Sequence, residues 1–70
     1  MDDVQRKLDV LLDYWVEHNT EHAEEFREWA ARISSLSGVA AQELLEAAAR
    51  MSDVNEQLMK AKQALPKSEE

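Results

Sequence analysis

The chain has 70 residues, no cysteine, one glycine and one proline, and a formal net charge of −7 at pH 7. This composition excludes disulfides and thiolate metal sites, favours helix, and argues against partners such as nucleic acid and anionic membranes, whose binding depends on Lys and Arg. The acidic amino terminus has no apolar signal segment and no run approaches a membrane span, so we expect a cytoplasmic protein.

The first predicted element is a helix from about residue 3 to about residue 36. Its apolar side chains fall on one stripe at about 100° per residue, as an amphipathic helix requires. We expect Gly38 to end this helix, because glycine adopts the left-handed conformation of a helix C-terminus without steric cost. The stripe consists of Val4, Leu8, Leu11, Leu12, Trp15, Phe26, Trp29, Ile33 and Leu36.

A turn at residues 37–38 leads into the second predicted helix, from about residue 39 to about residue 65. Pro66 ends it, because a proline disfavours the helical conformation in the residue before it. We expect the charged tail at residues 67–70 to be disordered. A break at Ser52-Asp53 is less favoured, because the apolar period continues through it; that period comprises Leu44, Ala48, Met51, Leu58 and Leu65.

Two long helices joined by a short turn must lie antiparallel, so the predicted fold is an all-α two-helix hairpin over residues 1–66. A chain of this size has marginal stability, and a lone hairpin leaves large aromatic side chains exposed. We therefore expect two copies to form a four-helix bundle, a homodimer with twofold symmetry. The expected interface consists of Trp15, Phe26, Trp29, Ile33, Met51 and Leu58.

Polar residues interrupt both stripes. His18, Asn19 and His22 break the apolar stripe of the first helix, and Asn55 breaks that of the second. A turn near residues 37 and 38 places these interruptions at similar heights, so Asn55 can reach the first helix. One interpretation is a structural layer in which the Asn and His side chains bond to one another and set the register, as a core Asn does in coiled coils.

A second interpretation is a metal centre. His18 and His22 are four residues apart, so they project from one helix face and can hold one ion. Imidazole and carboxylate suit zinc, nickel or cobalt, and Glu21, Glu25, a second copy or water would complete the site. A third interpretation is a pH-sensitive core without any cofactor, because histidine titrates near neutrality.

The segment His18 to His22 also fits the zinc-protease pattern H-x-x-E-H. We expect no enzymatic activity, because Glu21 lies away from the apolar stripe and a hairpin has no walled substrate cleft. Two functions remain. The first is a self-associating protein whose His/Asn centre binds a divalent metal. The alternative is an adaptor whose Trp15, Phe26 and Trp29 face receives a partner helix.

The segment W-V-E-H-N-T-E-H-A, from Trp15 to Ala23, resembles a motif of small uncharacterised helical-hairpin proteins from anaerobic bacteria and archaea. That motif is W-[IV]-x-H-N-x-x-H-A, preceded by a leucine-rich stretch and followed by an aromatic residue and W-A. The second helix of such proteins is rich in Ala, Glu and Leu and often contains an Asn like Asn55. The resemblance implies a hairpin, points to His18, Asn19 and His22, and implies no particular activity.

Overall fold

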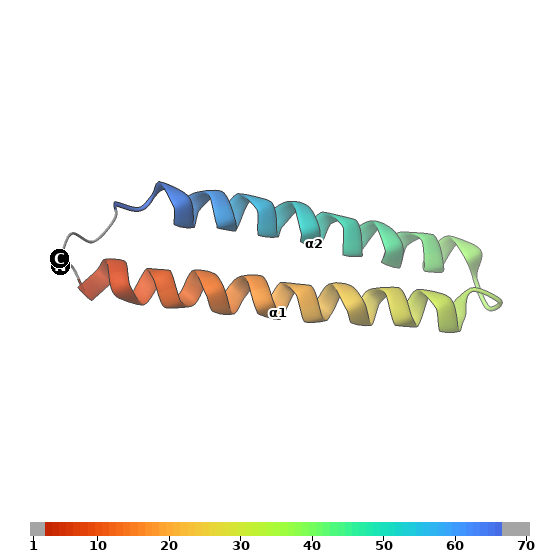
Figure 1. Cartoon of the computed structure of the whole chain (residues 1–70). Coiled ribbons are helices and arrows are strands. Elements are labelled where there is room, and N and C mark those ends of the chain that lie inside the picture. The colour runs from red at the N-terminus through yellow and green to blue at the C-terminus, as the bar shows by residue number, and fades with distance from the viewer. Residues whose placement is uncertain (1–2, 67–70) are drawn as a thin grey trace.

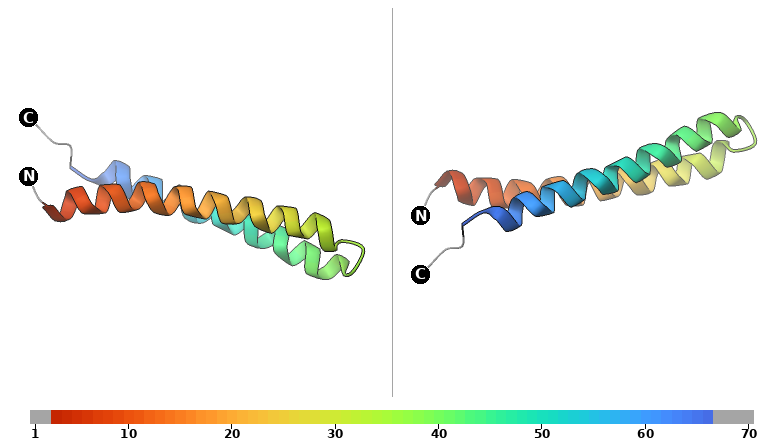
Figure 2. Two further views of the ribbon diagram at one scale, coloured as in Figure 1. Left: turned by 90° about the horizontal axis from the view of Figure 1, so that it is seen from below. Right: turned by 90° about the horizontal axis from the view of Figure 1, so that it is seen from above.

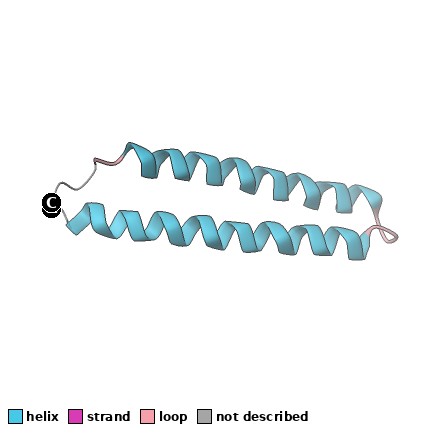
Figure 3. Cartoon of the chain, viewed as in Figure 1, coloured by secondary structure: helices cyan, strands magenta, loops and turns pink. Residues whose placement is uncertain are grey.

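The computed structural model describes residues 3–66 as two helices, α1 (Asp3–Ile33) and α2 (Gly38–Ala64). They run antiparallel and side by side, joined by a short turn at one end (Figures 1 and 3). Seen from above and below, the two helices cross at a shallow angle (Figure 2). The predicted all-α hairpin is confirmed for these residues, whereas the tail expected at residues 67–70 lies outside them.

The turn is built around a serine. α1 ends at Ile33, three residues earlier than expected, and its carbonyl accepts hydrogen bonds from the amides of Leu36 and Ser37 at 2.9 Å each. Ser37 is extended and caps α2, because its Oγ accepts a hydrogen bond from the Ala40 amide at 3.1 Å. Gly38 is the first residue of α2 and has no positive φ. The prediction that Gly38 ends the first helix in a left-handed conformation is therefore wrong.

Pro66 determines where α2 ends. α2 ends at Ala64, and Leu65 has extended backbone angles, with φ −67° and ψ 143°. Proline disfavours the helical conformation in the preceding residue, so Pro66 accounts for this end. Neither helix contains a stretch within residues 3–66 that is long and apolar enough to cross a membrane.

The two helices meet along a heptad seam. In each helix, most of the buried and half-buried residues recur at alternating intervals of three and four. This spacing is that of a coiled coil, in which the seam of each helix continually faces the other. The seam consists of Gln5, Asp9, Leu12, Val16, Asn19, Ala23, Phe26, Ala30 and Ile33 in α1, and of Ala41, Leu44, Ala48, Met51, Asn55, Leu58 and Lys62 in α2, followed by Leu65 just after its end.

The fully buried part of this seam is made almost entirely of alanine. Within residues 3–66 the buried apolar side chains are Leu12, Ala23, Ala30, Ala41 and Ala48. Alanine lets two helices approach closely, but each alanine removes little apolar surface from water. The two tryptophans of the apolar sequence pattern lie beside the seam, since Trp15 and Trp29 remain 39% and 51% exposed. The hairpin is long and thin, with extents of 56 × 14 × 14 Å.

The seam predicts opposite outcomes for two neighbouring alanines. Ala48 is 1% exposed between the helices, whereas Ala49 is exposed on the outer face of α2. We expect Ala48→Leu to lower the free energy of unfolding by about 1–3 kcal/mol, because the larger side chain forces the helices apart. Ala49→Leu is the matched control and should change it by less than about 0.5 kcal/mol. Urea denaturation followed by circular dichroism measures both, and equal effects would contradict this seam.

Candidate functional site

A polar layer links the two helices midway along the seam. The Oδ1 atom of Asn55 accepts a hydrogen bond from Nδ2 of Asn19 at 3.0 Å. Its Nδ2 donates to Oγ1 of Thr20 at 3.1 Å and to the Val16 carbonyl at 3.3 Å. The structure thus brings Asn19 and Asn55 together and adds Thr20, which the apolar pattern alone did not single out. The histidines have no part in these bonds.

His18 and His22 form a separate cluster on the neighbouring face of α1. Their Nε2 atoms are 3.2 Å apart, and Nδ1 of His22 is 3.2 Å from Oε1 of Glu25. A carboxylate only accepts hydrogen bonds, so in this arrangement Nδ1 of His22 carries the hydrogen. When His22 is neutral, its Nε2 atom is then an acceptor, and Nε2 of His18 donates to it. The His22 and Glu25 side chains are 40% and 63% exposed, so solvent reaches the cluster.

Aromatic rings hold the two imidazoles in place. Residues four apart are neighbours on a helix surface, and here four rings follow one another at that spacing. Tyr14 stacks on His18 with ring centroids 5.4 Å apart, and His22 stacks on Phe26 at 6.1 Å. Between them, the His18 and His22 rings meet edge to face at 4.5 Å. This ladder restricts the rotation of both histidines.

The four residues considered for a metal centre do not gather into one ligand set. Within residues 3–66, no group of three or more His, Cys, Asp or Glu side chains is placed to hold an ion. Glu25 bonds to Nδ1 of His22, on the other side of the ring from Nε2, so it can orient the imidazole but not share an ion with both Nε2 atoms. Glu21 is exposed on the outer face of α1. One chain therefore offers two converging ligands.

The residues expected at a dimer interface divide into two groups. Phe26, Ile33, Met51 and Leu58 are half-buried in the seam between α1 and α2. Trp15 and Trp29 lie outside it and are substantially exposed. The Arg32 guanidinium lies over the Trp29 ring, 4.5 Å from its centroid, which is a cation–π contact. The second group is the more exposed of the two, and the dimer interface itself stays a prediction.

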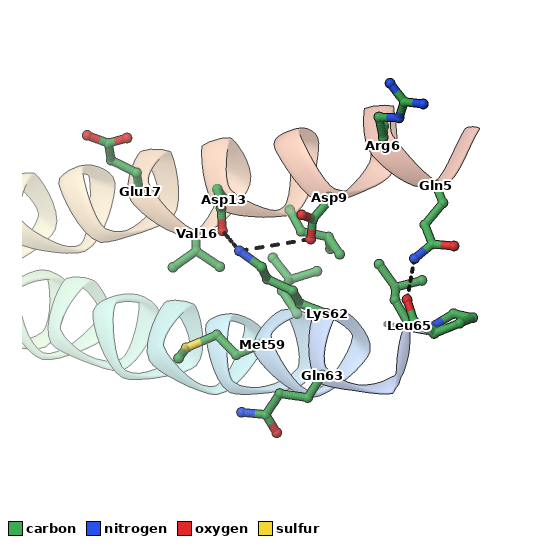
Figure 4. A pocket seen from close by; sticks show the side chains of 13 residues that line it. Gln5, Arg6, Asp9, Asp13, Val16, Glu17, Met59, Lys62, Gln63 and Leu65 are labelled. Atoms are coloured by element: carbon green, nitrogen blue, oxygen red, sulfur yellow. Dashed lines mark hydrogen bonds and ion pairs between the residues drawn. The ribbon is translucent and has the colours of Figure 1, made fainter. Parts of the chain in front are cut away.

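A second feature, at the open end of the hairpin, was missed by the sequence analysis. Figure 4 shows a groove in which Nζ of Lys62 reaches across from α2 to Oδ1 of Asp13, 2.5 Å away, and to Oδ1 of Asp9, 3.9 Å away. The pKa of Lys62 is raised, chiefly by the hydrogen bond to Asp13 and against the opposing effect of desolvation. The missed signal is that Lys62 occupies a seam position, where an apolar residue is the rule.

The chain belongs to the family described as a domain of unknown function, DUF8180. The family match spans residues 8–65 and therefore covers the polar layer, the histidine cluster and Lys62. The chain is also 47% identical over 55 residues to an uncharacterized protein of Archaeoglobus fulgidus, a match that covers 79% of this chain and 89% of the archaeal one. No solved structure matches it. These two matches confirm the resemblance to small uncharacterised proteins, whereas the motif W-[IV]-x-H-N-x-x-H-A stays a prediction.

The polar layer predicts a measurable coupling between its two asparagines. Asn19→Leu and Asn55→Leu each remove their shared hydrogen bond, and the double variant removes both polar side chains. We expect a double-mutant cycle to give a coupling energy of about 1 kcal/mol, because that is the typical net contribution of such a bond. Urea denaturation of the four proteins measures it. Strictly additive effects would contradict an energetic link between Asn19 and Asn55.

Lys62 predicts a loss of stability at alkaline pH. Its folded pKa lies above the ordinary value of 10.5, so its contribution to stability is fully present below that pH and disappears as pH rises through the folded pKa. The stability difference between wild type and Lys62→Met should therefore shrink at alkaline pH. Asp13→Asn should remove more of this dependence than Asp9→Asn, because the Asp13 contact is shorter. Equal effects of the two substitutions would contradict this assignment.

Proposed function

We propose that this protein is a non-enzymatic, self-associating helical hairpin whose His18 and His22 bind a divalent transition metal. The supporting observation is the 3.2 Å separation of their Nε2 atoms. Two zinc–nitrogen bonds of about 2.0–2.1 Å at a tetrahedral angle separate their nitrogens by about 3.3–3.4 Å. The two imidazoles thus already have the spacing of two ligands of one ion. Zinc, nickel and cobalt are the candidates, because all three accept imidazole.

The contact between Glu25 and His22 is of a kind that metal sites commonly contain. Histidine ligands of metals commonly donate their second N–H to a carboxylate, which fixes the tautomer and raises the basicity of the ligating nitrogen. The Nδ1 atom of His22 has this contact with Glu25 at 3.2 Å. An ion would replace the hydrogen between the two Nε2 atoms, and His18 would then carry its hydrogen on Nδ1. The net charge of −7 also favours the approach of a cation.

The test is metal titration of protein purified without a histidine tag. Isothermal calorimetry with Zn²⁺, and the visible absorption of Co²⁺, should both show binding that His18→Ala and His22→Ala abolish. Glu25→Gln should weaken it about 10–100-fold, the usual effect of losing a carboxylate behind a histidine ligand. Glu28→Gln removes an exposed carboxylate elsewhere on α1 and should leave affinity unchanged. Absence of binding, or equal affinity in the histidine variants, overturns the metal function.

A second candidate function is an adaptor that presents its aromatic face to a helix of another protein. The observation that favours it is the exposure of Trp15 and Trp29 outside the hairpin seam. Such an adaptor would bind a defined partner when both are purified, and Trp29→Ala would weaken that complex. Metal-independent complex formation with a chain that is otherwise monomeric would favour this function over the first.

A further inference from the structure

α1 carries a second heptad stripe in addition to the seam that faces α2. Its positions again alternate by three and four, at about 100° around the helix from the seam. The stripe consists of Leu8, Leu11, Trp15, His18, His22, Glu25, Trp29 and Arg32. Apolar residues precede the two central histidines, and Trp29 follows them between two charged residues; Leu11, Trp15 and Trp29 are 42%, 39% and 51% exposed. A helix with two heptad stripes can contact two neighbours, and the hairpin supplies only one of them.

We propose that a second copy of this chain covers the stripe, with the two α1 helices antiparallel about a twofold axis between the levels of His18 and His22. The inference rests on the proposed metal-binding function, because it completes the same site. The partner is a second copy because the stripe can pair with itself when two α1 helices lie antiparallel. Antiparallel pairing about this axis sets Leu11 opposite Trp29 of the second copy, and Trp15 opposite Glu25 of the second copy. His18 then lies opposite His22 of the second copy.

This register is better matched than its neighbours. Moving the pairing by one heptad in one direction sets Leu11 opposite His22 and Trp15 opposite His18, so that no histidine faces a histidine. Moving it the other way sets Leu11 opposite Leu36, which lies beyond the end of α1 at Ile33, and shortens the overlap. Only the proposed register brings histidine opposite histidine while pairing Leu11 with Trp29 at both ends.

The exposed area agrees with a missing partner. The chain exposes 5504 Å², whereas a compact monomer of 8.0 kDa exposes about 4,450 Å². The excess of about 1,050 Å² reflects the thin, two-helix shape, and it exceeds the ~800 Å² that each partner buries in a typical stable interface, so the chain has enough uncovered surface for one. The side of α2 next to the stripe is lined by small residues that leave room for a neighbouring helix, namely Ala40, Ala47, Val54 and Ala61.

Pairing His18 with His22 across the axis completes the metal site. Each copy supplies two Nε2 atoms, and four imidazoles form the four-coordinate set that a structural zinc site requires. Each copy also carries a net charge of −7, so the two repel and a dication at the axis offsets part of that repulsion. Dimerisation and metal binding are therefore coupled, with one ion for two chains.

Cysteine cross-linking tests the register, because the chain has no cysteine of its own. Leu11→Cys and Trp29→Cys proteins are mixed with Zn²⁺ and oxidised, and the disulfides are identified by mass spectrometry. The mixed 11–29 disulfide should exceed both homodisulfides several-fold. Val10→Cys is the matched control, since Val10 is 68% exposed but lies one position off the stripe. A second pair, Leu8→Cys with Arg32→Cys, repeats the test without removing a tryptophan.

The outcomes separate this inference from the proposed function. One Zn²⁺ for two chains together with enriched 11–29 disulfides supports both. Binding of one ion per chain, or no enrichment over the Val10→Cys control, overturns the four-imidazole centre but leaves the His18–His22 pair as a metal site. Enriched 11–29 disulfides without any metal binding overturn the metal function, and with it the shared site, while the α1–α1 contact stands.

Discussion

The register between α1 and α2 is the constraint on which the rest of the structure depends. The short turn between Ile33 and Gly38 limits how far the helices can shift, but the alanines that fill the buried seam do not distinguish one register from another. Asn55 does distinguish them, since its amide bonds both to Asn19 and to Thr20 on α1. A slipped hairpin would leave these groups without partners, at a cost of about 1–3 kcal/mol for each that stays buried. In the observed register, Lys62 reaches Asp13.

The same register determines which residues remain exposed and can contact a ligand or partner. Small side chains fill the contact between the helices, and the two tryptophans and two histidines stay on the outside of α1. The polar layer and the histidine cluster are neighbours along the helix but have different roles. The asparagines bond within the hairpin, whereas His18 bonds to His22, and His22 also bonds to Glu25, on a face that solvent reaches.

Much of the fold was predictable from the sequence, because apolar period and proline position are local signals. The chain was expected to form two antiparallel helices, and Asn55 was expected at the height of Asn19; the structure has both. The turn was not predicted correctly. Gly38 was expected to end the first helix, whereas in the structure Ser37, in an extended conformation, caps the second helix. Helix periodicity also did not distinguish the two stripes of α1. The large aromatic residues were assigned to the helix contact, whereas alanines line much of the actual seam. Lys62 was missed because the stripe of the second helix was traced through its apolar residues, and Lys62 is a charged residue at a seam position.

Both tryptophans of the chain lie on the outer stripe of α1, and neither lies in the hairpin seam. Trp29 is further distinguished by the Arg32 guanidinium over its ring. Indole emission depends on solvent contact and on nearby charge, so the intrinsic fluorescence of this protein reports on its outer surface rather than on its interior. Opening of the helix pair and covering of the outer face are therefore spectroscopically separable: backbone ellipticity follows the first, and tryptophan emission follows the second.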